Sequence, residues 1–429
     1  MTIRERGVSR LRSRVESLES RQLLSTIPFA TDASAQTGQG HVAVEVGPLS
    51  APHTPGGASQ SVTADLESPS MASFIDPTAA LRNARAITIG TQVYIGPFAN
   101  LTARGGATIS IGRSSNVQDN VTVRAVGPDG SVVIGDHAIL AHNASVIGPA
   151  TIGAPGGSAA FVGFNAVIDG ATVQPGAMVS SLARVAPGVV IPTGMKVKPG
   201  MFIGTQAEAE QESLGKVEPV TSGDIQFMND VVHVNETLAA GYSEQAVESP
   251  NSVRGVGPNP PAPPFNPISH TPTLAGSPTT APNFPNRIIG DVRMANLPRQ
   301  LHRVLGRGNS IRADEASPFI VGSIARMSNR VTVHGLEYSD LILGNRNAYG
   351  FHSVIHGGSD SGQNPNETTV VGNRVRVGAW AVVFRSTIGD RVRIGPYAYV
   401  DGSTLAPGTV VPRGAIIVNN QFLGRVQWV

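Results

Sequence analysis

The stretch Ile134-Gly-Asp-His-Ala-Ile-Leu140-Ala-His-Asn-Ala-Ser-Val146-Ile-Gly-Pro-Ala-Thr-Ile152 carries an aliphatic residue at every sixth position. The same period precedes it, at Ile89, Ile95, Leu101, Ile111, Val117 and Val123. Repeats of this kind build a parallel β-helix, in which each six-residue unit forms one flat side of a triangular prism and points its aliphatic residue inward. Because a single coil cannot bury those residues, the coils must stack.

The period of six returns in the C-terminal part of the chain. Its aliphatic and aromatic positions are Val321, Met327, Val333, Leu343, Tyr349, Ile355, Val371, Val377, Val383, Ile394 and Val400. The predicted fold class is therefore all-β, with two left-handed parallel β-helix domains, at residues 71–205 and 288–429, and a helical segment after the first.

The remaining segments separate these two domains or precede them. Residues 206–243 are predicted to be helical, with Ile225, Met228, Val232 and Leu238 on one apolar face. Residues 244–287 are rich in proline and read as a semi-extended linker. Residues 1–70 begin with a basic stretch, continue into Ser, Thr, Gly, Pro and Ala, and are expected to be disordered.

Composition narrows the possible functions. The chain has no cysteine, which excludes a disulfide scaffold and a thiol nucleophile, so any metal site must use histidine and carboxylates. The net charge of +2 gives no indication of the concentrated basic face that nucleic-acid binding needs. No apolar run reaches the roughly 18 residues that span a bilayer, and no membrane span is expected.

The N-terminal segment bears on localisation. Leu18-Glu-Ser-Arg-Gln-Leu-Leu-Ser25 resembles the "LEPR-XLL" segment that opens many large exported bacterial proteins. The resemblance implies export to the cell envelope or the extracellular space. The alternative is a solvated amphipathic tail on a cytoplasmic protein.

A second resemblance rests on two motifs of the C-terminal β-helix. Arg312-Ala-Asp-Glu315 is followed by His334 and Glu337, and His356 comes 22 residues after His334. These motifs resemble those of the γ-class carbonic anhydrases. The resemblance implies that His334 and His356 are zinc ligands, that Arg312 and Asp314 tie neighbouring subunits together, and that Glu315 and Glu337 are acidic residues near the metal. The family's middle ligand falls at Phe351, and His352 lies one position out of register.

The N-terminal β-helix shows the reverse pattern. Asn116-Val-Gln-Asp119 matches the family's Asn-x-Gln-Asp motif, whose Asn and Gln lie beside the metal-bound water, and the middle ligand is present as His142. Arg124 and Ile147 stand where the other two ligands would be, and a permanently charged guanidinium cannot bind Zn²⁺. The helical segment keeps the family's active-site asparagine as Asn235.

In this family each zinc is held by two histidines of one prism and one of its neighbour, and the losses here follow that division. The resemblance therefore implies one composite zinc site per chain, formed by His142, His334 and His356, with a fourth position open for water. Fe²⁺ or Co²⁺ would also suit three imidazoles. The expected function is reversible hydration of CO₂ to bicarbonate, with Gln118, Asn116 and Asn235 as orienting residues and Glu337 or Glu315 as proton shuttle.

Two other functions remain open at this point. The chain could be a catalytically inactive carbonic-anhydrase-like scaffold or assembly protein, or a hexapeptide acyltransferase. The expected partners are further copies of the chain or another subunit of γ-carbonic-anhydrase type.

Overall fold

The computed structural model describes residues 71–248, 285–290, 292–315, 319–336, 339–358 and 369–429. All of these belong to one compact unit, Asp65–Val429. Residues 1–70, most of the proline-rich linker (249–284) and Glu337 lie outside the described residues, and the expectations for them stay predictions. Within the described ranges, no helix is both long enough and apolar enough to cross a membrane.

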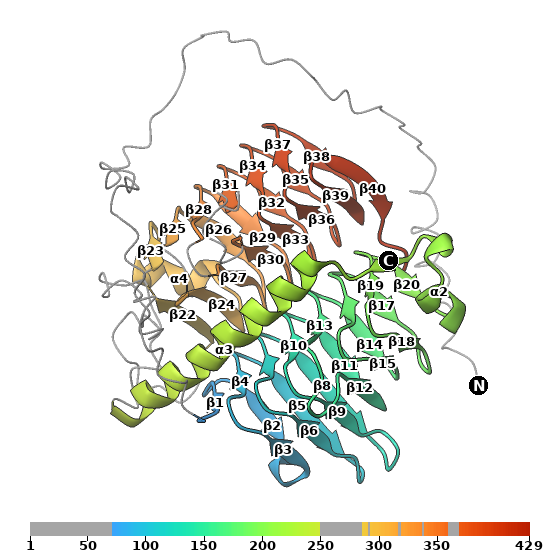
Figure 1. The fold of residues 1–429 in the computed structure, drawn as a ribbon. Coiled ribbons are helices and arrows are strands. Elements are labelled where there is room, and N and C mark those ends of the chain that lie inside the picture. Colours follow the sequence, from blue (N-terminus) through green and yellow to red (C-terminus); the bar gives the residue numbers. More distant parts are fainter. Residues whose placement is uncertain (1–70, 249–284, 291, 316–318, 337–338, 359–368) are drawn as a thin grey trace, which may run out of the picture. The chain divides into compact units, whose positions relative to one another are not determined.

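The first β-helix, here called the first prism, has three sheets as its sides (Figure 1). Sheet 1a holds β1 (Phe74–Ile75), β4 (Tyr94–Ile95), β7 (Asn116–Val117), β10 (Ala138–Leu140), β13 (Ala160–Val162), β16 (Met178–Val179), β19 (Met195–Val197) and the antiparallel β21 (Val217–Pro219). Sheet 1b holds β2 (Ala80–Arg82), β5 (Asn100–Arg104), β8 (Thr122–Val126), β11 (Ser145–Ile147), β14 (Val167–Asp169), β17 (Arg184–Val185) and β20 (Phe202–Ile203). Sheet 1c holds β3 (Ile87–Ile89), β6 (Ile109–Ile111), β9 (Val132–Ile134), β12 (Ala150–Ile152), β15 (Thr172–Val173) and β18 (Val190–Ile191).

The second prism also has three sheets as its sides. Each sheet is given the letter of the sheet at the equivalent position of the first prism. Sheet 2b holds β22 (Asn286–Gly290), β24 (Asn309–Ala313), β27 (Thr332–His334), β30 (Val354–His356), β33 (Val382–Phe384), β36 (Tyr399–Asp401), β39 (Ala415–Val418) and the antiparallel β40 (Gln421–Arg425). Sheet 2c holds β23 (Val292–Met294), β25 (Phe319–Val321), β28 (Leu341–Leu343), β31 (Thr369–Val371), β34 (Thr387–Ile388) and β37 (Thr404–Leu405). Sheet 2a holds β26 (Ile324–Met327), β29 (Asn347–Tyr349), β32 (Arg376–Val377), β35 (Arg393–Ile394) and β38 (Val410–Val411). The second prism thus begins at Asn286, two residues before the predicted start.

Each prism has its own aliphatic core, and the residues of the six-residue period form it. The predicted fold class, an all-β chain of β-helices with a helical segment, is confirmed. Strands this short need sharp corners, and the corner between sheets 1a and 1b uses Asn120, Asn143 and Asn165 at φ 59°, 62° and 56°. Asparagine tolerates this left-handed backbone better than most residues do.

The helical segment predicted over 206–243 contains two helices with a short strand between them. The chain forms α2 (Gln206–Glu210), a 3₁₀ turn (Glu212–Leu214), strand β21 and then α3 (Ser222–Glu248). Gly215, at φ 76°, ends the 3₁₀ turn, and Pro219 lies in the strand that follows. Met228, Val232 and Leu238 are buried as expected, but Ile225 is exposed.

The two prisms pack against each other inside the chain. Sheet 1a and its asparagine corner lie on sheet 2b, and α3 also packs at this interface (Figure 1). The shared apolar cluster includes Ile139, Phe161 and Met178 of sheet 1a, Val354, Val382 and Phe384 of sheet 2b, and Met228 and Val231 of α3. At the corner, the side-chain amides of Asn143 and Asn165 each donate to the His352 carbonyl at 3.1 Å.

Candidate metal centre

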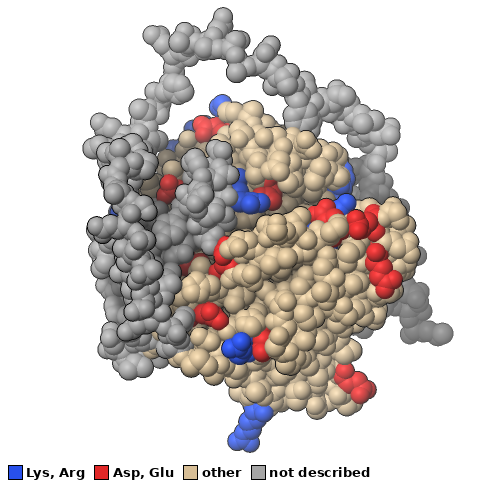
Figure 2. Space-filling model, in the orientation of Figure 1, with Lys and Arg blue, Asp and Glu red and all other residues tan. Residues whose placement is uncertain are grey.

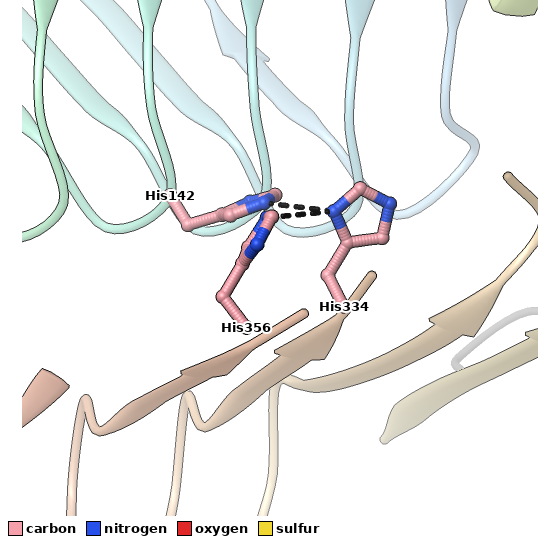
Figure 3. A group of neighbouring side chains, drawn as sticks. All are labelled: His142, His334 and His356. Carbon is pink, nitrogen blue, oxygen red and sulfur yellow. Dashed lines mark hydrogen bonds between the residues drawn. The ribbon is translucent and has the colours of Figure 1, made fainter. Parts of the chain in front are cut away.

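Three imidazoles meet at the interface between the prisms. His142 projects from the corner after β10, while His334 and His356 end the neighbouring strands β27 and β30, where they are paired in register. The Nδ1 atom of His334 lies 3.1 Å from Nε2 of His142 and 3.2 Å from Nε2 of His356 (Figure 3). All three side chains are buried, with at most 2% exposed. Residues 192 positions apart therefore share one site.

The outer nitrogen of each ring faces an acceptor. His142 Nδ1 lies 2.8 Å from Asp119 Oδ2, within hydrogen-bond distance although not ideally aligned. His356 Nδ1 lies 2.7 Å from the Gly357 carbonyl, and His334 Nε2 lies 3.1 Å from Glu315 Oε1. Such outer partners hold ring protons away from a metal and fix which nitrogen binds it. Lone pairs of the inner nitrogens therefore converge on one point.

Charges around the rings follow from burial and from these partners. Burial lowers the pKa of His142 to about 4, against the opposing effect of Asp119. Burial and the neighbouring imidazoles hold the pKa of His356 well below its usual range. Burial and Arg312 act to lower the pKa of His334, but the carboxylates of Glu315 and Asp314 outweigh them and raise it. The rings of His142 and His356 are therefore neutral, and the ring of His334 lies beside carboxylates. This arrangement favours a bound cation.

The donor set fits zinc. Two imidazole nitrogens bound tetrahedrally at about 2.0–2.1 Å from Zn²⁺ stand about 3.3 Å apart. Two of the three separations, 3.1 and 3.2 Å, are close to that value, and all three ligand atoms lie within 4.8 Å of one another. Three imidazole ligands would leave the fourth position of a tetrahedral zinc free for water, as in catalytic zinc sites.

A buried ionic network joins the prisms beside the imidazoles. Arg312 binds both oxygens of Asp119 across the interface, at 3.0 Å each, and Asp314 within its own prism at 2.6 Å. Although burial disfavours the charge, Arg312 and His142 keep the pKa of Asp119 well below its usual range. Arg312 and Asp314 were predicted to tie subunits together; here Arg312 ties two prisms of one chain.

Two further groups join this network and a second ion pair lies between the prisms, and the sequence reasoning missed all of them. Ser310 donates to Asp119, and Tyr242 of α3 donates to Asp314. Arg287 binds Asp76 at 2.9 Å in a second buried pair between the prisms. Asp76 directly follows β1, but nothing in the sequence pairs it with a residue 211 positions away.

The remaining predicted site residues are placed as follows. Asn116 and Gln118 are buried two residues apart on the side of sheet 1a that faces the second prism, and neither amide atom of Asn116 has a described hydrogen-bond partner. Glu315 is buried against the outer side of His334. Asn235 donates to the Val231 carbonyl of its own helix, and no described contact joins it to the imidazoles. His352 stacks on Trp380, 4.2 Å away, outside the cluster.

An apolar wall separates the imidazoles from a cavity. The Phe164 ring lies 5.6 Å from His142 and 4.9 Å from His356, and Phe384 lies 5.4 Å from His356. Both phenylalanines also line a cavity of about 830 Å³ between the prisms and the start of α3. The two phenylalanine rings therefore contact both the imidazoles and the cavity.

Known proteins resemble parts of this chain in sequence. No protein-family model matches the chain. A carbonic anhydrase of Methanosarcina thermophila is 31% identical over 192 residues, which cover 40% of this chain and 72% of that protein. The carboxysome assembly protein CcmM of Nostoc sp. is 32% identical over 165 residues, which cover 36% of this chain and 28% of that protein.

Two solved structures were also compared. A hexapeptide transferase family protein from Anaplasma phagocytophilum is 22% identical, with a TM-score of 0.18 over 39% of this chain and 91% of that one. A putative acetyltransferase from Desulfovibrio desulfuricans is 13% identical, with a TM-score of 0.24 over 79% and 66%.

The fold and the three convergent imidazoles define a hexapeptide-repeat β-helix protein with a candidate metal centre. The chain belongs to the γ-class carbonic-anhydrase-like family.

Proposed function

We propose that the chain is a carbonic anhydrase with one zinc site, shared by its two prisms. The observation that carries the proposal is the convergence of three imidazole nitrogens from both prisms, each ring backed by an acceptor. Held there, zinc would lower the pKa of a bound water to about 7 and supply hydroxide to attack CO₂.

Other residues near the site would orient the ligands, exclude bulk water or accept a proton in that reaction. Asp119 and the Gly357 carbonyl fix the tautomers of His142 and His356. The partnerless amide of Asn116 is free to orient a small polar ligand. Phe164 and Phe384 exclude bulk water, and the cavity beyond them offers CO₂ an apolar approach. The uncommitted Oε2 of Glu315 can accept a proton, with Glu337 as the other proposed shuttle.

The experiment compares zinc content and stopped-flow CO₂ hydration in the purified chain and in two variants. His142→Ala should lose both zinc and activity, because only two ligands remain. His302→Ala removes an exposed histidine of α4 (Pro298–Val304) and should change neither. Zinc-loaded wild type without hydration above buffer would defeat the enzyme proposal.

A second function, that of an inactive assembly protein, also has support. One relative is named an assembly protein, and Arg124, Ile147 and Phe351 stand at positions where the family has ligands. A zinc-replete but inactive wild type is the result that this alternative predicts.

A further inference from the structure

The second prism carries an unusual concentration of arginine. Residues 286–429 contain 16 arginines, no lysine and nine acidic residues, an imbalance that the whole-chain net charge of +2 conceals. Six of these arginines are exposed on sheet 2a and its adjoining corner. Arg326, Arg376 and Arg393 lie on the strands, and Arg346, Arg374 and Arg391 lie on the corner between sheets 2c and 2a. This set is called the arginine face.

The arginine face is unfavourable by itself. Arg376 and Arg393 are direct cross-strand partners, and neighbouring strands lie about 4.8 Å apart. Like charges that face each other across a strand pair destabilise a sheet. None of the six side chains forms an ion pair with a carboxylate in the described part of the chain. Asp390, nearby in sequence, accepts hydrogen bonds from the backbone and side chain of Asn373.

The equivalent face of the first prism is a protein interface. Asn116, Phe161 and Met178 occupy on sheet 1a the positions of Arg326, Arg376 and Arg393 on sheet 2a. The alignment rests on His142 and Phe351, which stand at the same position of the two prisms. Ile139 lies three residues before His142, and Ala348 lies three residues before Phe351, so these two residues correspond. The strand registers then align the neighbouring positions. Sheet 1a is buried against sheet 2b and α3, whereas the arginines of sheet 2a are exposed. Sheet 2a thus corresponds to the interface sheet of the first prism, but no described residue covers its arginines.

A second copy of this chain does not offer the arginine face a surface of opposite charge on the sheet that would dock there. The matching side would be sheet 1b, the equivalent of sheet 2b, and it exposes Arg82, Arg104 and Arg124. Its one acidic residue on a strand, Asp169, is paired with Arg184 at 3.0 Å. Two basic faces repel each other, which points to a different chain as the partner.

The spacing and the residue type favour a protein partner. Guanidinium groups bind carboxylates in pairs of hydrogen bonds, which lysine cannot do. A ladder with a repeat of about 4.8 Å matches carboxylates on the strands of another sheet. On the α3 face of the molecule, by contrast, charges of both signs are scattered among uncharged residues (Figure 2). We propose that the arginine face docks the acidic β-sheet surface of a different polypeptide.

The test measures binding of the full chain to three probes: labelled poly-L-glutamate, an oligodeoxythymidylate of equal charge, and vesicles of anionic phospholipid. R326Q/R376Q/R393Q removes the three strand arginines. R85Q/R299Q/R303Q removes three other exposed arginines and is the matched control. Binding of poly-L-glutamate should weaken about tenfold in the first variant and less than about twofold in the control.

Thermal melting keeps the test independent of folding. At low salt the first variant should melt at a higher temperature than wild type, because repulsion has been removed. Equal loss in both variants, or no binding of poly-L-glutamate, would overturn the proposal. Tighter binding of the oligonucleotide or the vesicles through the same arginines would replace the protein partner. Salt-reversible self-association in sedimentation would identify a second copy instead.

Discussion

Sheets 1b and 2b occupy equivalent positions in the two prisms, yet their outward faces differ in almost every respect. Sheet 2b carries Arg312, His334 and His356 in register, all buried under the first prism. The same register on sheet 1b reads Thr102, Arg124 and Ile147, partly or fully exposed. The two histidines and the arginine that pairs across the interface are thus present on the face that has a neighbouring prism. The described part of sheet 1b has none of them at the equivalent positions, and its ion pair, Asp169–Arg184, lies within the sheet. A metal site shared between prisms needs both halves.

The largest expected contrast between the two faces is in stability. Arg312→Ala leaves Asp119 and Asp314 buried without their cation, which should cost about 3–5 kcal/mol of unfolding free energy. Thr102→Ala, at the equivalent position on sheet 1b, should cost less than about 0.5 kcal/mol. Denaturant unfolding of both variants measures the contrast. Similar costs in the two variants would mean that the network does not hold the prisms together.

Metal affinity is the next contrast. His334→Ala should weaken zinc binding more than about 100-fold, since losing even an outer partner of a ligand costs about 10–100-fold. Arg124→Ala removes the residue at the equivalent position of sheet 1b and should leave affinity unchanged. Competition with a zinc chelator gives both values. Comparable affinities in these variants would place the zinc elsewhere.

A smaller effect is expected from the acceptor behind His334. Glu315→Gln keeps the shape of the side chain but removes its charge from His334 Nε2, 3.1 Å away. Zinc affinity should fall about tenfold, at the low end for such outer partners. Glu212→Gln, an exposed change in the 3₁₀ turn, is the control. Unchanged affinity in Glu315→Gln would show that this carboxylate does not support the ligand.

The smallest expected effect on zinc content comes from restoring two histidines on sheet 1b, which has no described neighbouring prism. Arg124→His with Ile147→His would give sheet 1b the two-histidine half of a site. Without a facing third imidazole, zinc content measured by elemental analysis should stay at one per chain. A second tightly bound zinc would show that two histidines of one prism suffice to bind the metal. The contrast between sheets 1b and 2b would then not explain where zinc binds.

The sequence predicted the β-helices well because the six-residue period is a local signal that directly reports the inward position of each strand. Helix breaks were harder to predict. The 206–243 region has helical composition on both sides of Gly215 and Pro219, but β21 forms because it can pair with β19, a contact set by the tertiary fold.

The candidate site could be predicted only in part. The resemblance to a family picked out His142, His334 and His356, but their convergence depends on how two separate prisms pack, which no spacing encodes. Tyr242, Ser310 and the Asp76–Arg287 pair were missed for the same reason, since each contact joins distant parts of the chain. Net charge misled in another way, because +2 overall hides a second prism dominated by arginine.

X-ray absorption spectroscopy at the zinc edge, on protein whose metal content has been determined, tests the central claim most directly. The account predicts one zinc per chain with three imidazole nitrogens at about 2.0 Å and one further light-atom ligand. It also predicts that His142→Ala, a change in the first prism, removes an imidazole from the signal or removes the zinc altogether. A wild-type spectrum with two or fewer imidazoles, or one unaltered by His142→Ala, would contradict a site built from both prisms.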